Sequence, residues 1–208
     1  MNFKDTIGVY PNAFTKQECK ELINSFEEKI KDGRAIKGES SSGINNNKKL
    51  TIDYNIFNSN EQKDIELRNM VAERFNHYLS NEYFFNYPHG DIFNHSSVVD
   101  GKTFYPAFNL QKYINNKGHY NAWHTERDHY GVTTRLFVFI LYLNNVKEGG
   151  ETKFLFKENK NDKDFYSVSP EVGKLIIHPA SWPYIHKGAM PKSNDKYILT
   201  TWLQYAEV

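Results

Sequence analysis

Five short apolar runs between residues 108 and 205 constrain the fold of this chain more than any other feature. Each run has the length and the β-branched and aromatic content that are typical of a strand. They are FNLQKYI (108–114), RLFVFILYL (135–143), TKFLF (152–156), GKLIIH (173–178) and KYILTTWLQY (196–205). Turn-forming segments such as EGGE, SPEVG and PKSND separate them. Several short strands of this kind predict a β-sandwich or jelly roll.

Two helical patterns precede these runs. Thr15 and Glu18 have the spacing of a capping box, and apolar residues then recur on one helix face until Gly33, which suits a helix C-terminus. A second amphipathic pattern covers roughly residues 60–79. Between the helices, residues 37–49 (KGESSSGINNNKK) have the polar composition of a mobile surface loop. The order of the patterns predicts an α+β fold whose N-terminal helices pack on one sheet.

Length and composition narrow the class of protein. The 208 residues predict a single domain, 1–208, with helices in residues 1–100 and a strand-rich core over about 104–206. The formal net charge of +1 gives no general electrostatic reason for binding nucleic acid or an anionic membrane. Cys19 is the one cysteine, and there is no signal-peptide pattern and no apolar run that could span a bilayer. We therefore expect a cytoplasmic protein.

The segment WHTERDHYGV (123–132) concentrates potential metal ligands ahead of a strongly apolar run. Residues i and i+2 of a strand point to the same side, so His124 and Glu126 would face one cavity. A histidine from elsewhere would complete a set of two imidazoles and one carboxylate, which leaves positions on a ferrous ion open for a bidentate co-substrate and O₂. Taken alone, the spacing also fits polar surface residues.

The last strand pattern carries a lysine in an unusual position. Lys196, Ile198, Thr200 and Trp202 alternate onto one face of the expected strand, and His186 precedes Lys196 by ten residues. A lysine that shares a half-buried face with apolar residues needs an anionic partner in the interior. The alternative is a lysine at the strand edge whose ammonium reaches solvent.

These segments together resemble the Fe(II)/2-oxoglutarate-dependent oxygenases, specifically the prolyl 4-hydroxylase-like branch. Five blocks in the same order carry the resemblance over most of the chain. They are VYPNAFTKQECKELI (9–23), KYINNKGHYNAWHTE (112–126), LYLNNVKEGGETKF (141–154), VSPEVGKLIIHP (168–179) and HKGAMPKSNDKYILTTW (186–202). The resemblance implies that the strands form a double-stranded β-helix, the jelly roll of that family.

The resemblance also implies roles for individual residues. His124, Glu126 and His186 would hold the iron. Lys196 and Tyr113 would bind the distal carboxylate of 2-oxoglutarate. These assignments are expectations carried over from the family at matching positions.

Three further positions are less strongly implied. Thr200 shares the face of Lys196 and would line the same pocket. Arg135 would either line the pocket or brace its strand. Glu126 departs from the family pattern, which has an aspartate there, and Asp128 is the rival carboxylate, although it would need a turn or a helix to come alongside.

The remaining histidines and tryptophans have simpler interpretations. His178 follows an apolar run and could be mistaken for the distal ligand, but it sits where the family generally has an aromatic residue. His119 and His129 are expected to support the site or to lie on the surface. The tryptophans are expected in the core or in a pocket wall, except that Trp182 lies in a loop and could meet the substrate.

The implied activity is that of a dioxygenase that uses Fe(II), 2-oxoglutarate and O₂, with ascorbate as a further possible ligand, and releases succinate and CO₂. The expected substrate is a prolyl residue in a peptide or protein. Alternatives are a hydroxylase of a free amino acid or another small molecule, and a metal-binding jelly roll without oxygenase activity. A protein that only binds metal has no need for a dicarboxylate clamp such as Lys196 with Tyr113. The resemblance further implies that residues 37–49 fold over a bound peptide; an ordinary connecting loop is the alternative.

Overall fold

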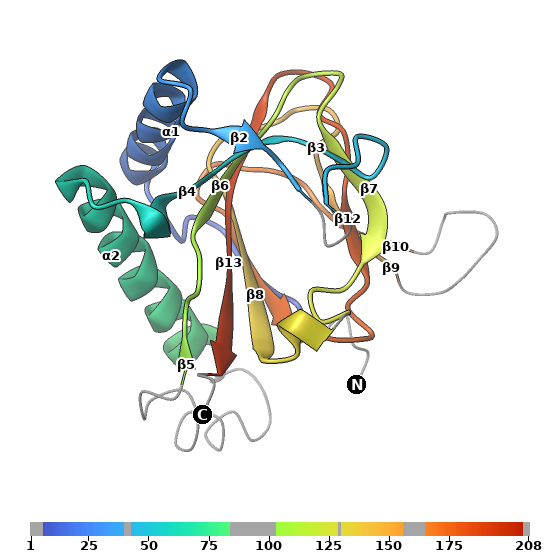
Figure 1. Cartoon of the computed structure of the whole chain (residues 1–208). Helices are drawn as coiled ribbons and strands as arrows, with labels where there is room; N and C mark the ends of the chain where they lie inside the picture. Colours follow the sequence, from blue (N-terminus) through green and yellow to red (C-terminus); the bar gives the residue numbers. More distant parts are fainter. Residues whose placement is uncertain (1–5, 40–42, 84–102, 129, 156–164, 206–208) are drawn as a thin grey trace.

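The computed structural model describes residues 6–39, 43–83, 103–128, 130–155 and 165–205, and everything below concerns these residues. Two antiparallel sheets face each other, and two helices cover the outer face of the larger sheet (Figure 1). This is the jelly-roll arrangement with N-terminal helices that the sequence predicts, and the fold class is confirmed.

The larger sheet has eight strands among the described residues. In sheet order they are β1 (Gly8–Tyr10), β11 (Leu175–Pro179), β8 (Arg135–Tyr142), β13 (Lys196–Tyr205), β6 (Asn109–Tyr113), β4 (Ile52–Asn55) and β2 (Ile36–Lys37), with β5 (Thr103–Phe104) paired to β13. The described part of the smaller sheet has five strands, in the order β10 (Phe165–Val168), β9 (Thr152–Leu155), β12 (His186–Gly188), β7 (His119–His124) and β3 (Lys49–Leu50).

Helix α1 (Lys16–Lys31) begins where the capping box predicts. The backbone N–H of Glu18 donates to Thr15 Oγ1 at 3.2 Å, and the backbone N–H of Thr15 donates to Glu18 Oε2 at 2.7 Å. Two of the N–H groups that a helix start leaves without intrahelical partners are thereby satisfied. Gly33, with φ of +72°, follows the last turn, so both ends of the predicted helix are confirmed.

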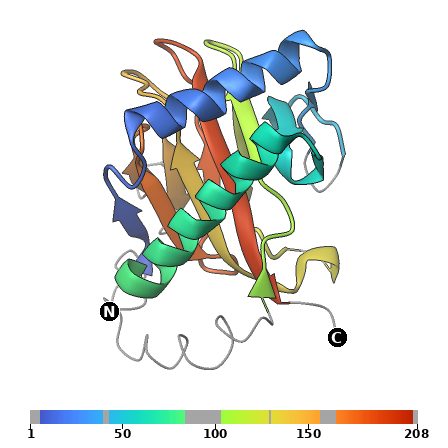
Figure 2. The same ribbon diagram turned by 90° about the vertical axis from the view of Figure 1, so that its left-hand side faces the viewer.

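Helix α2 (Gln62–His77) lies within the predicted range 60–79 and continues into a π-helical segment, η3 (Tyr78–Tyr83). Leu67, Val71 and Phe75 are buried on its inner side. Figure 2 shows α1 and α2 lying across the same face of the larger sheet. The helices therefore cover one face of the larger sheet, and the opposite face of that sheet lies toward the smaller sheet.

The side chains of β8 and β13 alternate between two apolar cores, as the alternation along a strand requires. One core lies between the helices and the larger sheet and includes Phe139 and Leu199. The other lies between the two sheets and includes Ile140 and Ile198. The predicted phase of the last strand is thus confirmed, since Ile198 lies on the inter-sheet face and Leu199 on the helix face.

The N-terminal region contributes more strands than the sequence suggested. Strands β1, β2, β3 and β4 all come from the first 55 residues and pair with strands of the C-terminal half or with one another. Residues 37–49 start at β2 and end at β3, and Lys49 is 5 % exposed, so this segment is anchored at both ends. Residues 40–42 within it lie outside the described residues.

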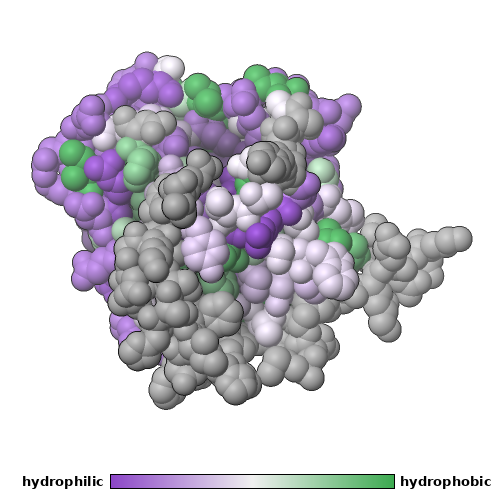
Figure 3. Space-filling view, turned by 60° about the horizontal axis from the view of Figure 1, so that its bottom comes forward, coloured by the Kyte–Doolittle hydropathy of each residue, from purple (hydrophilic) through white to green (hydrophobic). Residues whose placement is uncertain are grey.

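The surface of the described residues is mainly hydrophilic on the face shown in Figure 3, where hydrophobic residues form separate small patches. Such scattered apolar residues are ordinary on a folded protein. In the described part of the chain, no helix combines the length and the apolar character that crossing a membrane requires.

Candidate metal centre

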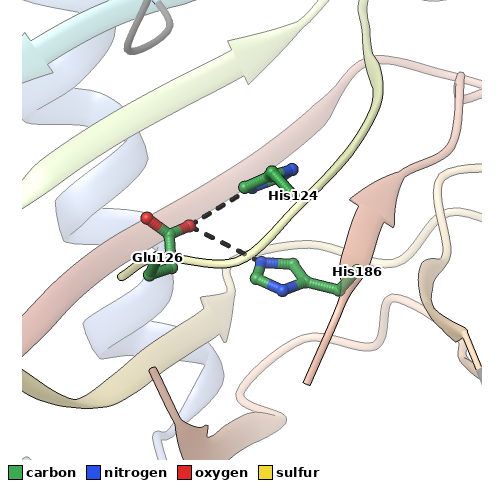
Figure 4. A group of neighbouring side chains, drawn as sticks. All are labelled: His124, Glu126 and His186. Carbon is green, nitrogen blue, oxygen red and sulfur yellow. Dashed lines mark ion pairs between the residues drawn. The ribbon is translucent and has the colours of Figure 1, made fainter. Parts of the chain in front are cut away.

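His124, Glu126 and His186 come together between the sheets (Figure 4). Glu126 Oε1 lies 3.3 Å from His124 Nε2 and 3.5 Å from His186 Nε2. The three potential ligand atoms all lie within 4.8 Å of one another. One carboxylate oxygen and two imidazole nitrogens that converge in this way form the donor set of a mononuclear non-haem metal site.

Two antiparallel strands place the histidines. His124 is the last residue of β7 and His186 is the first residue of β12, and the two are paired in register. Glu126 lies beyond the end of β7 in a bend, where its backbone N–H donates to the carbonyl of Ala180 at 3.0 Å. The prediction that Glu126 lies in the same strand as His124 is therefore wrong. A bend after the strand brings its carboxylate to the histidines instead. Asp128 is exposed and does not belong to the converging group.

Backbone carbonyl groups orient both imidazole rings. His124 Nδ1 lies 2.9 Å from the carbonyl oxygen of Ala122, and His186 Nδ1 lies 3.1 Å from that of Tyr184. A carbonyl oxygen only accepts, so each Nδ1 donates a proton to it and each Nε2 is the nitrogen that faces Glu126. This is how metal-binding histidines are usually held.

The carboxylate is anionic at neutral pH. Burial by itself raises the pKa of Glu126, but hydrogen bonds and charge interactions with His124 and His186 outweigh it and hold the pKa well below its ordinary value. In the other direction, burial lowers the pKa of His186, and the neighbouring His124 lowers it further. A neutral His186 and an ionised Glu126 are the protonation states in which both can bind a cation.

Arg135 holds the other oxygen of the carboxylate. Its Nη1 lies 3.1 Å from Glu126 Oε2 and donates also to the backbone carbonyl of Glu126 at 3.2 Å. The guanidinium stacks on the ring of Trp202, 3.8 Å from the ring centre. Arg135 therefore lines the cavity, which is one of the two roles expected for it, and it also holds Glu126.

Lys196 and Tyr113 lie side by side in the same cavity as the triad of His124, Glu126 and His186. The Lys196 Nζ is 3.8 Å from the centre of the Tyr113 ring, and the residue is 1 % exposed. It donates to the carbonyl oxygen of Gly150 at 3.0 Å, and no carboxylate of the described residues pairs with it. Burial lowers the pKa of Lys196 to about 7 because the charged form has lost water, and the negative charge of Glu151 offsets this loss only in part.

There is space beside this pair for a ligand. A Cβ atom placed on Gly188 would lie 3.6 Å from the Tyr113 hydroxyl and 3.7 Å from Lys196 Nζ, so the missing side chain leaves room next to both donors. A buried ammonium and a phenol that face the same space are the groups that a carboxylate needs. The residues present therefore fit a dicarboxylate whose far end lies between them.

A cavity of about 430 Å³ connects these groups. It is lined by the triad, by Tyr113, Lys196 and Thr200, and by apolar side chains from β8 and β13. The ends of the segment 37–49 reach it through Lys37, Gly38 and Glu39 and through Lys49. Trp202 lies in its wall, whereas Trp182 is 77 % exposed and is not among the residues that line it.

Sequence reasoning missed a chain of polar contacts along one wall. Lys49 Nζ donates to Asp53 Oδ2 at 2.7 Å, Gln111 Nε2 donates to the same oxygen at 3.2 Å, and the Tyr113 hydroxyl donates to Gln111 Oε1 at 3.3 Å. Asp53 and Gln111 are paired across β4 and β6. Their signal in the sequence is the polar residues at the positions of β4 and β6 that face the cavity. This signal can be recognised only when the pairing of the strands is known.

His178 lies next to the triad without joining it. It is fully buried, and its ring centre is 4.9 Å from that of His186. Its Nδ1 lies 2.8 Å from the carbonyl oxygen of Pro179. Burial lowers its pKa to about 3, so the ring is neutral and packs as an aromatic side chain. His119 is not one of the three converging residues, and its Nδ1 contacts the carbonyl of Lys117 at 2.9 Å; His129 lies outside the described residues.

Comparisons with known proteins agree with this geometry. Residues 108–204 match the model of the 2OG-Fe(II) oxygenase superfamily. Prolyl 4-hydroxylase 13 of Arabidopsis thaliana is 25 % identical over 98 % of this chain and 73 % of its own length.

Solved structures share the fold. A Pseudomonas putida prolyl-4-hydroxylase superposes with a TM-score of 0.67 at 14 % identity, covering 96 % of this chain and 92 % of its own. A Trichoplax adhaerens prolyl hydroxylase, solved in complex with a hypoxia inducible factor peptide fragment, gives a TM-score of 0.68 at 13 % identity and covers 97 % and 84 %. The matched residues 108–204 run from the start of β6 to the end of β13 and contain His124, Glu126 and His186. Residues 108–204 therefore match the 2OG-Fe(II) oxygenase superfamily, and the chain shows distant homology to the prolyl 4-hydroxylases.

Proposed function

We propose that this protein is an Fe(II)- and 2-oxoglutarate-dependent dioxygenase that hydroxylates a C–H bond of a prolyl residue in a peptide or protein and releases succinate and CO₂. One observation carries the proposal: a buried lysine without a carboxylate partner lies beside a preformed group of two histidines and one glutamate. Burying an ammonium group costs free energy unless an anion pairs with it. The lysine and the adjacent metal-binding group are therefore best explained by a ligand that carries a carboxylate and also reaches the metal.

His124 Nε2, His186 Nε2 and Glu126 Oε1 would hold the iron, because these are the atoms that converge. When bound, Fe(II) supplies the activation of O₂ and the oxidation of the C–H bond. The protein contributes the fixed orientation of these three side chains. With three ligands from the protein, further coordination positions would remain for a co-substrate and O₂.

Lys196 and Tyr113 would bind the distal carboxylate of 2-oxoglutarate. Burial of both residues keeps water away from this contact, and a charge-assisted hydrogen bond is stronger in such surroundings. Thr200 lies further along the same face of β13, opposite Asn109 of β6, and lines the same cavity. Val138, Ile140 and Ile198 form an apolar wall that limits the access of water to the reacting groups.

The relatives support a prolyl substrate. The matching plant protein is named as a prolyl 4-hydroxylase, and the Trichoplax relative of similar fold is described with a bound peptide. The cavity wall away from the triad is polar, with Asp53, Asn55, Asn109 and Gln111 on β4 and β6. Carboxylate and amide side chains of this kind suit the N–H and C=O groups of a peptide backbone.

A mass-spectrometric screen tests the proposal. The purified protein is incubated with Fe(II), 2-oxoglutarate, ascorbate and a panel of proline-containing peptides and free amino acids. We expect a peptide to gain the mass of one oxygen atom at a proline, together with an equal amount of succinate. The His124→Ala protein serves as the control. An oxygen added to a residue other than proline, or only to a free amino acid, would replace the prolyl assignment, and the absence of any succinate formation would remove the oxygenase assignment.

A further inference from the structure

The two oxygens of the Glu126 carboxylate have different partners. Oε1 lies 3.3 Å and 3.5 Å from the Nε2 atoms of His124 and His186. Oε2 lies 3.1 Å from Nη1 of Arg135, on the other side of the carboxylate. The carboxylate therefore presents one oxygen to the converging group, while the other oxygen is held by a cation.

Arg135 is itself held in place. It is the first residue of β8 and is paired with Gln204 of β13. Its guanidinium stacks on Trp202 at 3.8 Å, and its Nη1 also donates to the backbone carbonyl of Glu126 at 3.2 Å. The planar guanidinium thus contacts both the side chain and the backbone of one residue. The two hydrogen bonds from Nη1 hold both the side chain and the backbone of Glu126, which a single hydrogen bond would not do.

A glutamate needs this support more than an aspartate does. Its extra methylene adds a rotatable bond, and a flexible glutamate can swing away from a metal or chelate it through both oxygens. Chelation through both oxygens would occupy one of the positions that a bidentate co-substrate and O₂ require. An arginine that holds one oxygen opposes this chelation and leaves the other oxygen directed at the histidines.

We propose that Arg135 is a positioning residue that holds Glu126 Oε2, so that the glutamate binds the metal through Oε1 alone. The inference rests on the proposed function, because it concerns the same metal site. It also explains how a glutamate, with its longer side chain, serves at this position. The side chain is long enough to bridge the histidines and Arg135, and an aspartate at position 126 could not reach both.

Metal binding measured without turnover tests the inference. Co(II) is titrated into the purified protein and into Arg135→Met, and the visible absorption of the bound ion reports its coordination number. We expect the Co(II) affinity of Arg135→Met to fall about tenfold, the usual effect of removing a group that orients a metal ligand, together with a changed absorption spectrum. Arg127→Met is the matched control, since Arg127 is an exposed arginine next to Glu126 in the sequence and should bind Co(II) like the wild type.

A double-mutant cycle distinguishes positioning from a general structural effect. Glu126→Asp shortens the side chain and breaks the contact with Arg135, so adding Arg135→Met to it should change the affinity by less than about twofold. Thermal unfolding without metal shows whether each variant is folded. If Arg135→Met does not fold, Arg135→Lys, which keeps the charge and the aliphatic chain, replaces it in the same cycle and should lose less affinity.

Three results would overturn the inference. The first is wild-type affinity and an unchanged spectrum in a folded Arg135→Met protein. The second is a cycle in which the losses of Arg135→Met and Glu126→Asp simply multiply. In both cases the wild-type protein still binds Co(II), so the proposed function survives. The third is a wild-type protein that binds no Co(II), which would remove the proposed function as well.

Discussion

Lys196 and Tyr113 face each other across β13 and β6, with the lysine Nζ 3.8 Å from the centre of the tyrosine ring. Both residues are buried, at 1 % and 3 % exposed. The antiparallel register of the two strands creates this pair, and the absence of a side chain at Gly188 leaves room beside it. In the proposed function this pair binds the distal carboxylate of 2-oxoglutarate, a contact that a protein which only binds a metal would not need.

Replacement of Lys196 should affect the co-substrate and leave the metal in place. Lys196→Met keeps the aliphatic chain and removes the ammonium. A charge-assisted hydrogen bond contributes roughly 1.5–3 kcal/mol, so we expect the KM for 2-oxoglutarate to rise about 10- to 100-fold. Co(II) affinity without 2-oxoglutarate should remain that of the wild type. Loss of the metal with an unchanged KM for 2-oxoglutarate would remove Lys196 from the clamp.

The affinity for 2-oxoglutarate should depend on pH through the same lysine. Burial lowers the pKa of Lys196 to about 7, and in the proposed function the distal carboxylate of 2-oxoglutarate would bind the protonated form. Below this pH the lysine is already charged and the affinity is constant. Above it each binding event must take up a proton, so the affinity should fall by up to about tenfold per pH unit. Isothermal titration calorimetry at several pH values measures the slope. Lys196→Arg should abolish it because arginine stays protonated, and a flat wild-type profile would contradict the prediction.

The carboxylate ligand can be assigned by comparing two neighbouring acids. Glu126→Gln removes the negative charge at the converging group and should greatly weaken Co(II) binding. Asp128→Asn is the matched control, because Asp128 is exposed and does not belong to that group. It should bind Co(II) with wild-type affinity. Retention of the metal by Glu126→Gln combined with its loss in Asp128→Asn would transfer the ligand role to Asp128.

A buried charge cluster joins α1 to the start of α2. Lys29 is 1 % exposed and lies 3.1 Å from the carboxylate of Asp64, which is fully buried. Lys29→Met would leave that carboxylate without its cation, which typically costs about 3–5 kcal/mol of the free energy of unfolding. Urea denaturation at pH 7 measures the loss. Lys31→Met, at an exposed position of the same helix, should change stability by less than about 0.5 kcal/mol. A similar effect of both substitutions would contradict a specific role for the cluster.

The same cluster predicts a loss of stability in acid. Burial alone raises the pKa of Asp64, but hydrogen bonds from Ser59, Lys29 and Ser25 outweigh burial and lower the pKa below its ordinary value. The stabilisation is therefore complete above the pKa of an unfolded aspartate, about 3.9, and is lost as the pH falls from there through the folded pKa. Urea midpoints measured between about pH 5 and pH 3 should fall more steeply for the wild type than for Asp64→Asn. Parallel profiles would show that other carboxylates dominate.

The local sequence pattern was sufficient to predict several parts of this structure. The capping box at Thr15 and Glu18 predicted where α1 begins, because capping depends on residues three apart. The alternation after Lys196 predicted which side chains of β13 face the cavity, because the side-chain period of a strand is two. Neither inference needed a partner segment.

The placement of Glu126 shows where local pattern fails. A strand was expected to carry it, whereas a bend after β7 does, and the contacts that hold it come from Ala180 and Arg135, which are distant in sequence. The chain of contacts from Lys49 through Asp53 and Gln111 to Tyr113 was not anticipated at all. Such contacts depend on how strands from different parts of the chain pair.

The sequence by itself therefore determined the two helices, the main strands of the C-terminal half, the phase of β13 and the residue types available for a metal and a dicarboxylate. Only the tertiary structure decided that Glu126 and not Asp128 meets the histidines, that Tyr113 lies against Lys196, and that an arginine takes the second carboxylate oxygen. The physical reason is that hydrogen bonding and side-chain alternation within a segment are local, whereas strand register and the packing of two sheets are set by the burial of residues that are far apart along the chain.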